Sequence, residues 1–300
     1  MTDTPLRTIA TGFTFLEGPR WHEGRLWFSD FYTHRVLSID ADGGDATTEC
    51  EVPEQPSGLG WLPDGRLLVV SMKDRRVLRR EPDGRLVMHA DLSGIATGLC
   101  NDMVVDAQGR AWVGNFGFDL MNDGPIATAA LACVQPDGNA SVAADGLYFP
   151  NGSMITPDGR TLIVGESFGN RISAFDIGAD GRLGPRRDWA VFGELPPLGV
   201  APSALGRRAV APDGAALDAE GCVWCADAAG RRVIRVAPGG RILASISTDP
   251  MGVFACMLGG DDRRTLFICV APDSHPSGRA PVREAQLWAT TVEVPGAGWP

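Results

Sequence analysis

Six positions along the sequence stand just ahead of a Gly or a small polar start to an apolar stretch, and four of them carry oxygen-donor side chains. The six residues are Glu17, Ser57, Asn101, Asn151, Asp213 and Met251. If the stretches that follow them are repeats around an axis, equivalent positions form a ring and their oxygens converge. Carboxylate and amide oxygens without His or Cys in register are typical of a hard-cation site. We therefore expect one divalent ion, with calcium as the first choice and magnesium, manganese or zinc as alternatives.

Turn formation is the other interpretation of these positions. Taken singly, Asn151-Gly152 and Asp213-Gly214 are more typical of turns than of ligands, because Asn-Gly and Asp-Gly pairs are common turn chemistry. Glu17 differs, since a glutamate before Gly18 and Pro19 has no turn-forming advantage. Pointed at an axis, its charge would be buried without a cation to compensate it. Four donors in one repeat register favour the cation site.

The elements that must position these donors are short strands in a sixfold repeat. Each unit runs strand, Asp/Gly turn, strand, loop and strand, as in residues 18–21, 25–29 and 35–39. The turn glycines at 24, 65, 109, 159 and 221 are spaced by 41, 44, 50 and 62 residues. This is the period of four-stranded propeller blades with loop insertions. The sequence predicts an all-β, six-bladed β-propeller with four-stranded antiparallel blades, a metal site on the central axis and one domain over residues 1–300.

Ring closure requires one further pairing. We expect residues 6–10 near the N-terminus to pair with the last blade, whose strands are predicted at 265–270 and 285–292. Closure of this kind removes the exposed edges that an open stack of sheets would leave. No stretch of helical periodicity competes with the strands over a useful length, so an all-β chain is favoured over an α/β one.

Composition narrows the classes of partner. The 38 glycines and 22 prolines punctuate apolar strands in a chain of 44% hydrophobic residues, which fits a turn-rich β protein. A net charge of −10 argues against nucleic acid or an anionic membrane as a partner. The N-terminus lacks a basic region followed by an apolar run, and no 18-residue apolar stretch occurs. We expect a cytoplasmic protein that is a monomer or a weak homo-oligomer.

The seven cysteines are odd in number and irregularly spaced, which argues against a disulfide framework. Cys222 and Cys225 have the spacing of a redox or zinc pair. They fall in a predicted strand, however, where residues three apart face opposite sides. We expect them to be buried structural thiols.

Four motifs together resemble a known family. They are Leu16-Glu17-Gly18-Pro19-Arg20-Trp21, Asn101-Asp102 followed by residues 106–114, Phe149-Pro150-Asn151-Gly152, and Pro212-Asp213-Gly214 followed by residues 218–224. Over nearly its whole length, the chain resembles the family of senescence marker protein (regucalcin), gluconolactonase and luciferin-regenerating enzyme, which are six-bladed propellers. The resemblance implies that Glu17, Asn151 and Asp213 are the protein ligands of a single divalent metal. It also implies that Asn101 contacts substrate or a metal-bound water, and that the family hydrolyses lactones.

The chemistry that follows is hydrolysis of a lactone or a related cyclic ester. A divalent ion can polarise the lactone carbonyl and lower the pKa of a bound water. A carboxylate within reach of that water can take its proton. Asp213 is the candidate for both ligand and general base, and for Glu17 a role as ligand only is favoured.

One departure from the sugar-lactone members bears on the substrate. In the sugar-lactone members that this chain resembles, an arginine stands two residues before the asparagine of the Asn-Asp pair. In this chain that position is Leu99, two residues before Asn101. The loops expected on the same face are also largely apolar and include Phe116, Phe118, Met121 and Phe168. Packing between loops is the other explanation for these side chains. We expect Leu99 and these four residues to bind a small-molecule lactone or ester that is apolar or aromatic.

Three questions stay open on the sequence. A non-catalytic propeller with a structural metal, or a metal-assisted isomerase or lyase on the same scaffold, would also fit the repeat, because fold does not dictate function. His34 and His275, on loops of the same face, are possible auxiliary acids or bases. A second polar series at the ends of the second strands could form an outer shell or simply complete turns: Asp30, Ser71, Asn115, Glu166 and Asp227.

Overall fold

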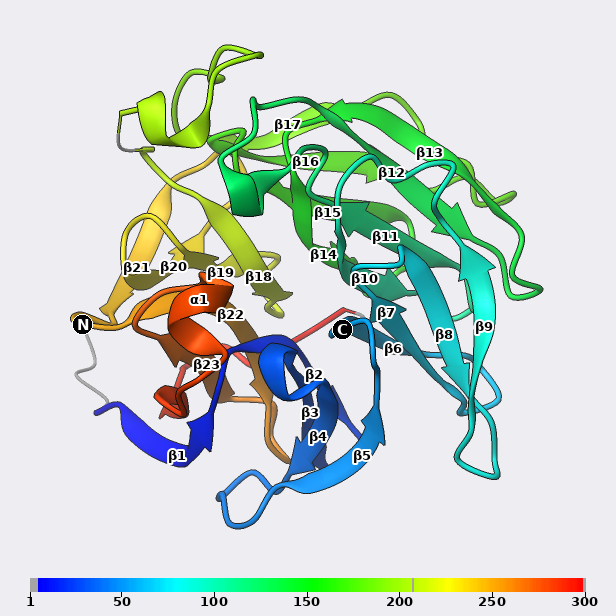
Figure 1. The fold of residues 1–300 in the computed structure, drawn as a ribbon. Coiled ribbons are helices and arrows are strands. Elements are labelled where there is room, and N and C mark those ends of the chain that lie inside the picture. Colours follow the sequence, from blue (N-terminus) through cyan, green and yellow to red (C-terminus); the bar gives the residue numbers. More distant parts are fainter. Residues whose placement is uncertain (1–4, 207, 299–300) are drawn as a thin grey trace.

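A computed structural model describes residues 5–206 and 208–298, and in this part of the chain 24 strands form six four-stranded sheets. The sheets surround a common centre, and the chain passes through them in sequence order (Figure 1). Every strand pairing within them is antiparallel. The predicted six-bladed, all-β propeller is confirmed.

Five blades are contiguous in sequence and run outward from the centre in chain order. The first has β2 Leu16–His22, β3 Arg25–Asp30, β4 Arg35–Ile39 and β5 Thr47–Glu51, and the second has β6 Pro56–Trp61, β7 Leu67–Ser71, β8 Arg76–Arg80 and β9 Leu86–Asp91. The third has β10 Cys100–Val105, β11 Ala111–Asn115, β12 Ala129–Val134 and β13 Ala140–Leu147. The fourth has β14 Pro150–Ile155, β15 Thr161–Glu166, β16 Arg171–Asp176 and β17 Arg187–Val191. The fifth has β18 Pro212–Leu217, β19 Val223–Asp227, β20 Arg232–Val236 and β21 Ile242–Ser247.

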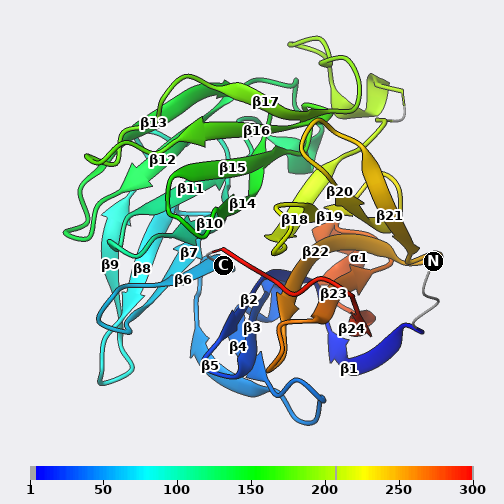
Figure 2. The ribbon, with the colours of Figure 1, turned by 180° about the vertical axis from the view of Figure 1, so that it is seen from behind.

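The sixth blade joins the two ends of the chain. It consists of β22 Gly252–Gly259, β23 Thr265–Ala271, β24 Ala285–Thr291 and the N-terminal strand β1 Arg7–Phe13. β1 pairs antiparallel with β24, and the two lie side by side in Figure 2. The expected closure by the N-terminal segment is confirmed. The first strands β2, β6, β10, β14, β18 and β22 contact one another in a closed cycle, so they are the innermost strands.

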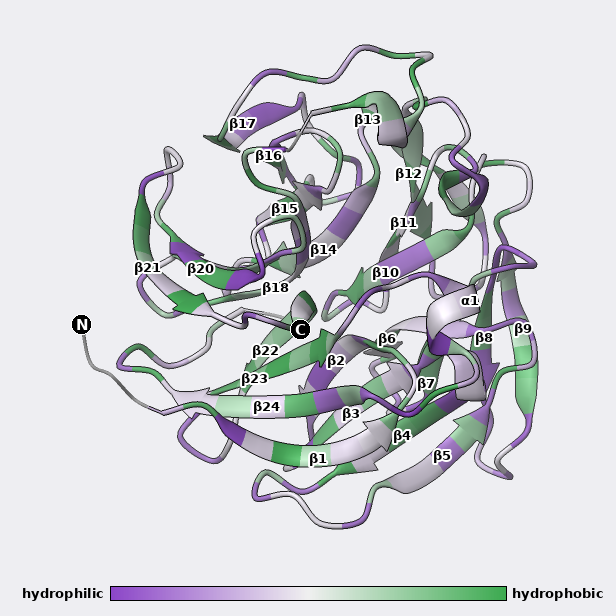
Figure 3. Ribbon diagram, turned by 60° about the vertical axis from the view of Figure 1, so that its left-hand side comes forward, coloured by the Kyte–Doolittle hydropathy of each residue, from purple (hydrophilic) through white to green (hydrophobic). Residues whose placement is uncertain are grey.

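The hydrophobic pattern explains which strands were easy to predict. The second strand β7 is buried along its whole length and reads as a nearly continuous apolar run. The innermost strand β10 is equally buried but carries the polar residues Asn101 and Asp102. Outer strands such as β5 are largely exposed and short of apolar residues. Figure 3 shows hydrophilic and hydrophobic segments alternating along β20, as expected for a strand with two different faces. The turn glycines at 24, 65, 109, 159 and 221 all have positive φ, which matches their expected turn role.

Four short helical turns lie in the connections: η1 Phe31–Thr33, η2 Leu120–Asn122, η3 Pro202–Ala204 and α1 Pro276–Arg279. After β24 the chain crosses the propeller at the ends of the inner strands (Figure 2). There Ala297 donates a backbone hydrogen bond to Leu217, the last residue of β18, at 2.8 Å. The C-terminal segment therefore lies at the far ends of the inner strands, opposite the face at which these strands begin.

All seven cysteines are free thiols, and only Cys50 is not fully buried. Cys225 lies in β19 and Cys222 immediately precedes it. Both are buried structural thiols, as expected. Within the described ranges, none of the helices has the length and apolar character needed to cross a lipid bilayer.

Candidate functional site at the propeller axis

The sequence-predicted donors occupy one register position of the inner strands. Glu17, Ser57, Asn101, Asn151 and Asp213 are each the second residue of β2, β6, β10, β14 and β18. In each of these strands the pairing register shifts at or immediately after this residue, so an irregularity marks the same place in five blades. We call Glu17, Asn101, Asn151 and Asp213 the axial donor set.

The sixth position of this register is not Met251. Met251 precedes β22, and the second residue of that strand is the buried Val253. In this longer strand the register shift lies between Val253 and Ala255. A Cβ built on Gly214 would lie 2.5 Å from the Cβ of Ala255, which places Asp213, the residue before Gly214, level with Phe254, the residue before Ala255. The sixth blade therefore contributes an apolar side chain at this register, and the Met251 assignment was three residues early.

The glycines that follow the donors serve close packing of inner strands rather than turns. A Cβ on Gly152 would lie 2.3 Å from the carbonyl oxygen of Asp213, and one on Gly58 would lie 2.4 Å from the backbone nitrogen of Met103. Such separations are far below van der Waals contact, so only glycine permits this approach. The turn interpretation of Asn151-Gly152 and Asp213-Gly214 is wrong, because both pairs lie inside strands.

Asn151 and Asp213 are in direct contact. Asn151 Nδ2 donates to Asp213 Oδ1 at 2.5 Å and to Ser167 Oγ at 3.0 Å. Ser167 Oγ in turn donates to the carbonyl of Pro212 at 2.7 Å. Both amide hydrogens of Asn151 are therefore engaged, which fixes the orientation of the amide. Its Oδ1 is left buried with no hydrogen-bond partner in the described structure.

Two carboxyl groups with raised pKa values face the same centre. Burial, then the charges of Asp213 and Asp102, raise the pKa of Glu17 well above its ordinary value. Burial, then the charge of Asp102, raise the pKa of Asp213 to about 8, against the lowering effect of the hydrogen bond from Asn151. Asp102 itself is paired with Arg20 at 2.7 Å, and both side chains of that pair are buried. The axis therefore concentrates negative charge that no cation of the chain fully offsets.

This arrangement fits a hard divalent cation. A buried amide oxygen without a hydrogen-bond partner and two buried carboxyls with raised pKa values are groups whose burial a bound cation would compensate. Within the described residues, no group of three or more His, Cys, Asp or Glu side chains could hold a metal ion. The axial donor set instead offers two carboxyl groups and two amides, which supply the oxygen ligands that calcium accepts. The axial metal site itself stays a prediction.

Asn101 lies beside this group. Its Oδ1 accepts a hydrogen bond from Ser57 Oγ at 3.3 Å, and its side chain is buried. No hydrogen bond joins its amide nitrogen to another residue of the described chain. That nitrogen remains a donor for an oxygen of a ligand.

The apolar side chains expected to bind substrate are largely packed against one another. Phe118 and Phe168 meet edge to face at 5.2 Å between ring centroids, and Phe116 lies 4.3 Å from Phe149. Phe116, Phe118 and Phe168 are buried. Leu99 and Met121 are partly buried and pack against the same apolar core. The rings of Phe116, Phe118, Phe149 and Phe168 thus form one aromatic cluster.

The polar series at the ends of the second strands completes local structure. Asp30 accepts from the backbone of Thr14 and Phe15, and Asp227 accepts from Ala211 N at 3.0 Å and pairs with Arg232 at 2.9 Å. Glu166 pairs with Arg171 and accepts from Tyr148 N, and Asn115 accepts from Gly117 N. Each of these four side chains accepts a backbone hydrogen bond from a loop next to its own blade and so holds that loop in place. Their contacts support the turn interpretation rather than an outer shell of the axial donors.

Neither candidate histidine contacts an axial donor. His34 Nδ1 lies 2.6 Å from the carbonyl of Pro53, and His275 Nδ1 lies 2.7 Å from Ser277 Oγ. His275 Nε2 also lies 3.4 Å from the carbonyl of Met121, which links the sixth-blade loop to the loop of η2. Both histidines are engaged in loop contacts.

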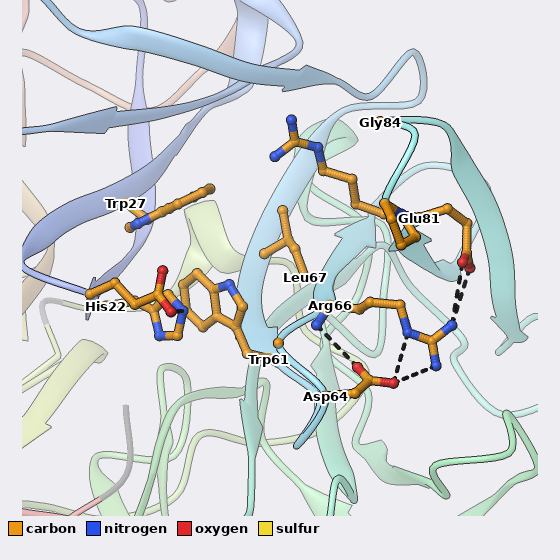
Figure 4. A pocket seen from close by; sticks show the side chains of 12 residues that line it. His22, Trp27, Trp61, Asp64, Arg66, Leu67, Glu81 and Gly84 are labelled. Carbon is orange, nitrogen blue, oxygen red and sulfur yellow. Dashed lines mark hydrogen bonds and ion pairs between the residues drawn. The ribbon is translucent and has the colours of Figure 1, made fainter.

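A surface hollow of about 410 Å³ lies at the other end of β2, between the first two blades (Figure 4). His22, the last residue of β2, stacks on Trp61 at 3.8 Å. Arg66 is held there by Asp64 at 2.7 Å and by Glu81 at 3.3 Å. Because the charged groups are paired with each other and the axial donors lie at the opposite strand ends, this hollow is not the candidate for chemistry.

Arg208 also lies on the site face, although the sequence gives it no functional signal. Arg208 precedes β18, and its guanidinium carbon lies 4.0 Å from the ring centroid of Phe168. Burial lowers the pKa of Arg208, and the charges of Asp213 and Asp227 oppose this shift. Nothing in the local sequence distinguishes this loop arginine from its neighbours.

Comparison with known proteins places this geometry in a family. Residues 15–272 match the family described as the SMP-30/Gluconolactonase/LRE-like region. A regucalcin of Danio rerio is 30% identical over 299 residues, with 93% of this chain and 92% of the relative covered. A 6-deoxy-6-sulfogluconolactonase of Pseudomonas putida is 26% identical over 289 residues, covering 95% and 93%. A solved regucalcin from Agrobacterium tumefaciens, described as a calcium-binding protein, has a TM-score of 0.78 at 20% identity, covering 99% and 97%. The resemblance drawn from the four motifs is confirmed, and the chain belongs to the SMP-30/gluconolactonase/LRE-like family.

Proposed function

We propose that this protein is a metal-dependent hydrolase that opens a lactone or a related cyclic ester. The observation that carries the proposal is the contact between Asn151 and Asp213, which leaves Asn151 Oδ1 buried without a partner beside two carboxyls of raised pKa. The family includes lactonases, and the sulfogluconolactonase among the relatives is in line with this chemistry.

Glu17, Asn151 and Asp213 are the proposed protein ligands of one divalent ion. Calcium is the first choice because all three offer hard oxygen donors, and the solved regucalcin is described as a calcium-binding protein. When bound, such an ion would polarise a lactone carbonyl and make a nearby water more acidic.

The side chains of the protein would then perform the proton transfer and hold the substrate. Asp213 is the proposed general base, because its Oδ1 is held by Asn151 while its second carboxylate oxygen can accept a proton from water. Asn151 cannot rotate freely, since Ser167 holds its other amide hydrogen. Asn101 would donate its unpaired amide nitrogen to an oxygen of the substrate.

The proposed substrate is apolar or aromatic rather than a sugar lactone. Leu99 offers no hydrogen bond to ring hydroxyls, and a hydroxylated ring placed against it would lose its bonds to water without replacement. Phe116, Phe118 and Phe168 already form an aromatic cluster, and Met121 packs on the same core. These five residues are the proposed substrate-binding wall.

The test is a lactone panel assayed on metal-stripped protein. Sugar lactones are compared with alkyl and aryl lactones after addition of calcium, magnesium, manganese or zinc. We expect turnover only with added metal, highest with calcium and with an alkyl or aryl lactone. Turnover that is independent of metal would contradict the proposed ligands.

If no lactone of the panel is hydrolysed, the result would point to other functions of the same scaffold. Tight metal binding without turnover of any lactone would favour a binding propeller with a structural metal. Metal-dependent conversion of a lactone without uptake of water would favour an isomerase or a lyase. Product analysis by mass spectrometry in H₂¹⁸O separates these cases, because only hydrolysis incorporates the label.

A further inference from the structure

We propose that Arg208 binds an anionic group of the substrate, so that the lactone this protein opens carries a carboxylate or a similar oxyanion. This inference rests on the proposed lactone hydrolysis and adds a substrate class to it. Arg208 lies in the connection between β17 and β18, five residues before Asp213 in sequence. It is therefore attached to the strand that carries the proposed base.

Aromatic stacking holds the face of the guanidinium. The Arg208 Cζ is 4.0 Å from the centroid of the Phe168 ring, and Phe168 is in turn fixed edge to face by Phe118 at 5.2 Å. A guanidinium stacked in this way keeps its N–H donors in its own plane, directed away from the ring. The stack orients the side chain without using any of its hydrogen bonds.

The donors of Arg208 have no partner among the described residues. Its Nε is buried and makes no hydrogen bond, and no ion pair or side-chain hydrogen bond joins Arg208 to another described residue. The arginines that begin the third strands of the fourth and fifth blades are paired, Arg171 with Glu166 at 2.8 Å and Arg232 with Asp227 at 2.9 Å. A partly buried guanidinium without a partner requires an explanation, and an external oxyanion supplies one.

The two acids that attract Arg208 are already engaged. Burial lowers its pKa, and the charges of Asp213 and Asp227 oppose that shift. Asp213 is held by Asn151, and Asp227 is held by Arg232 and by Ala211 N. Arg208 therefore lies near two carboxylates that accept no hydrogen bond from the N–H groups of its guanidinium.

The charge count of the site favours an anion once a divalent ion is present. The formal charges of Glu17 and Asp213 would be cancelled by that ion, and Asp102 is balanced by Arg20 at 2.7 Å. The positive charge of Arg208 then remains. A substrate with an apolar ring and one oxyanion satisfies both the aromatic cluster and this charge, whereas a neutral lactone leaves the donors unpaired.

The experiment compares two lactones that differ in one charge, phthalide and 5-carboxyphthalide, with the calcium-loaded protein. Arg208→Gln removes the charge, Arg208→Lys keeps it but loses the planar fork, and Arg160→Gln is the matched control. Arg160 is exposed and lies in the turn of the fourth blade, at the opposite strand ends.

We expect wild type to prefer 5-carboxyphthalide through a lower KM. Arg208→Gln should reduce that preference, measured as the ratio of kcat/KM values, by about tenfold, with Arg208→Lys in between.

A merely structural role of Arg208 predicts a different result. Arg208→Gln would then lower kcat/KM for both lactones equally and leave their ratio unchanged, which would overturn the proposal. An equal loss of preference in Arg160→Gln would also overturn it, because the effect would then come from net charge alone.

A binding measurement separates this inference from the proposed hydrolysis. Calorimetry with benzoate and its neutral analogue benzamide, with and without calcium, reports anion binding without turnover. If neither lactone is opened but benzoate binds more tightly than benzamide in wild type and not in Arg208→Gln, lactone hydrolysis fails while the Arg208 site stands. If the lactones are opened and benzoate shows no dependence on Arg208, hydrolysis stands and the Arg208 site is wrong.

Discussion

Asn151 of the fourth blade donates its side-chain amide to Asp213 of the fifth blade at 2.5 Å, and this single contact joins two inner strands at the axis. The same amide is held on its other side by Ser167, so its oxygen is buried with no partner. A buried oxygen that is held in place but accepts no hydrogen bond costs free energy unless a ligand binds it. The two residues are therefore best understood as one unit that orients Asp213 and offers an oxygen to a cation.

Asp213→Asn should abolish hydrolysis while leaving measurable metal binding. The substitution keeps an oxygen ligand but removes the group proposed to take a proton from water, so we expect kcat to fall by about 10²-fold or more. Calcium affinity, measured by calorimetry, should fall less than kcat does. Full activity of Asp213→Asn in the lactone assay would remove Asp213 from the role of base.

Glu17→Gln should weaken calcium binding and stabilise the metal-free protein. Burial and the neighbouring acids raise the pKa of Glu17, so its charge is unfavourable when no cation is bound. A neutral amide of the same shape removes that cost. We expect a higher Tm than wild type in the presence of a chelator and a lower Tm in calcium. A variant less stable than wild type in both conditions would show that the glutamate carries a structural bond instead.

The stability of the metal-free protein should fall with rising pH because of Asp213. Its pKa is raised from 3.8 to about 8 in the folded state, so the folded protein retains a proton that the unfolded chain has released. The stability from this group is present below pH 3.8 and is lost as the pH rises through about 8. We expect the unfolding free energy of wild type, relative to Asp213→Asn, to decline by up to about 1.4 kcal/mol per pH unit between these limits.

The comparison is made by urea unfolding in a chelator, so that the other acids cancel between the two proteins. Saturating calcium should flatten the difference, because a bound cation favours the ionised carboxylate. A pH-independent difference in the chelator would mean that Asp213 is ionised in the folded protein without a metal.

The sequence alone predicted the parts of the fold that depend on local chemistry. Turn glycines such as Gly65 and Gly159 require positive φ, and the buried second strands β7 and β15 leave nearly continuous apolar runs. The outer strand β5 left almost no signal, because it is largely exposed and only one of its sides is paired. The register of β22 was also misjudged, since Met251-Gly252 resembles the donor-glycine pattern while Phe254 occupies the equivalent position.

For the candidate site, sequence spacing identified the donors but not their surroundings. Asn101, Asn151 and Asp213 share a strand register that repeats can reveal. The stacking of Arg208 on Phe168 joins two loops that are 40 residues apart in sequence, and no periodicity encodes it. The burial of Phe168 likewise depends on its ring contact with Phe118, which only the closed propeller produces.

Gly152→Ala should disrupt the site through packing alone. The added Cβ would lie 2.3 Å from the carbonyl oxygen of Asp213 and 2.8 Å from the backbone nitrogen of Ala215, so β14 and β18 must separate. We expect a loss of about 1–3 kcal/mol in unfolding free energy together with weaker calcium binding. Gly94→Ala is the matched control, because a Cβ at Gly94 meets nothing within 4 Å. Equal behaviour of the two variants would contradict the close approach of the inner strands.

Leu99→Arg should shift substrate preference towards hydroxylated lactones. Leu99 is partly buried against the apolar core beside the aromatic cluster, and a guanidinium there would supply donors for ring hydroxyls while reducing apolar contact. We expect the ratio of kcat/KM for δ-gluconolactone to that for phthalide to rise by about tenfold or more, since each hydrogen bond to a charged group contributes about 1.5–3 kcal/mol. Leu99→Met, which keeps an apolar side chain of similar volume, is the control and should leave the ratio within about twofold. An unchanged ratio in Leu99→Arg, with the protein folded and calcium bound, would show that position 99 does not face the substrate and that the apolar wall must be sought elsewhere.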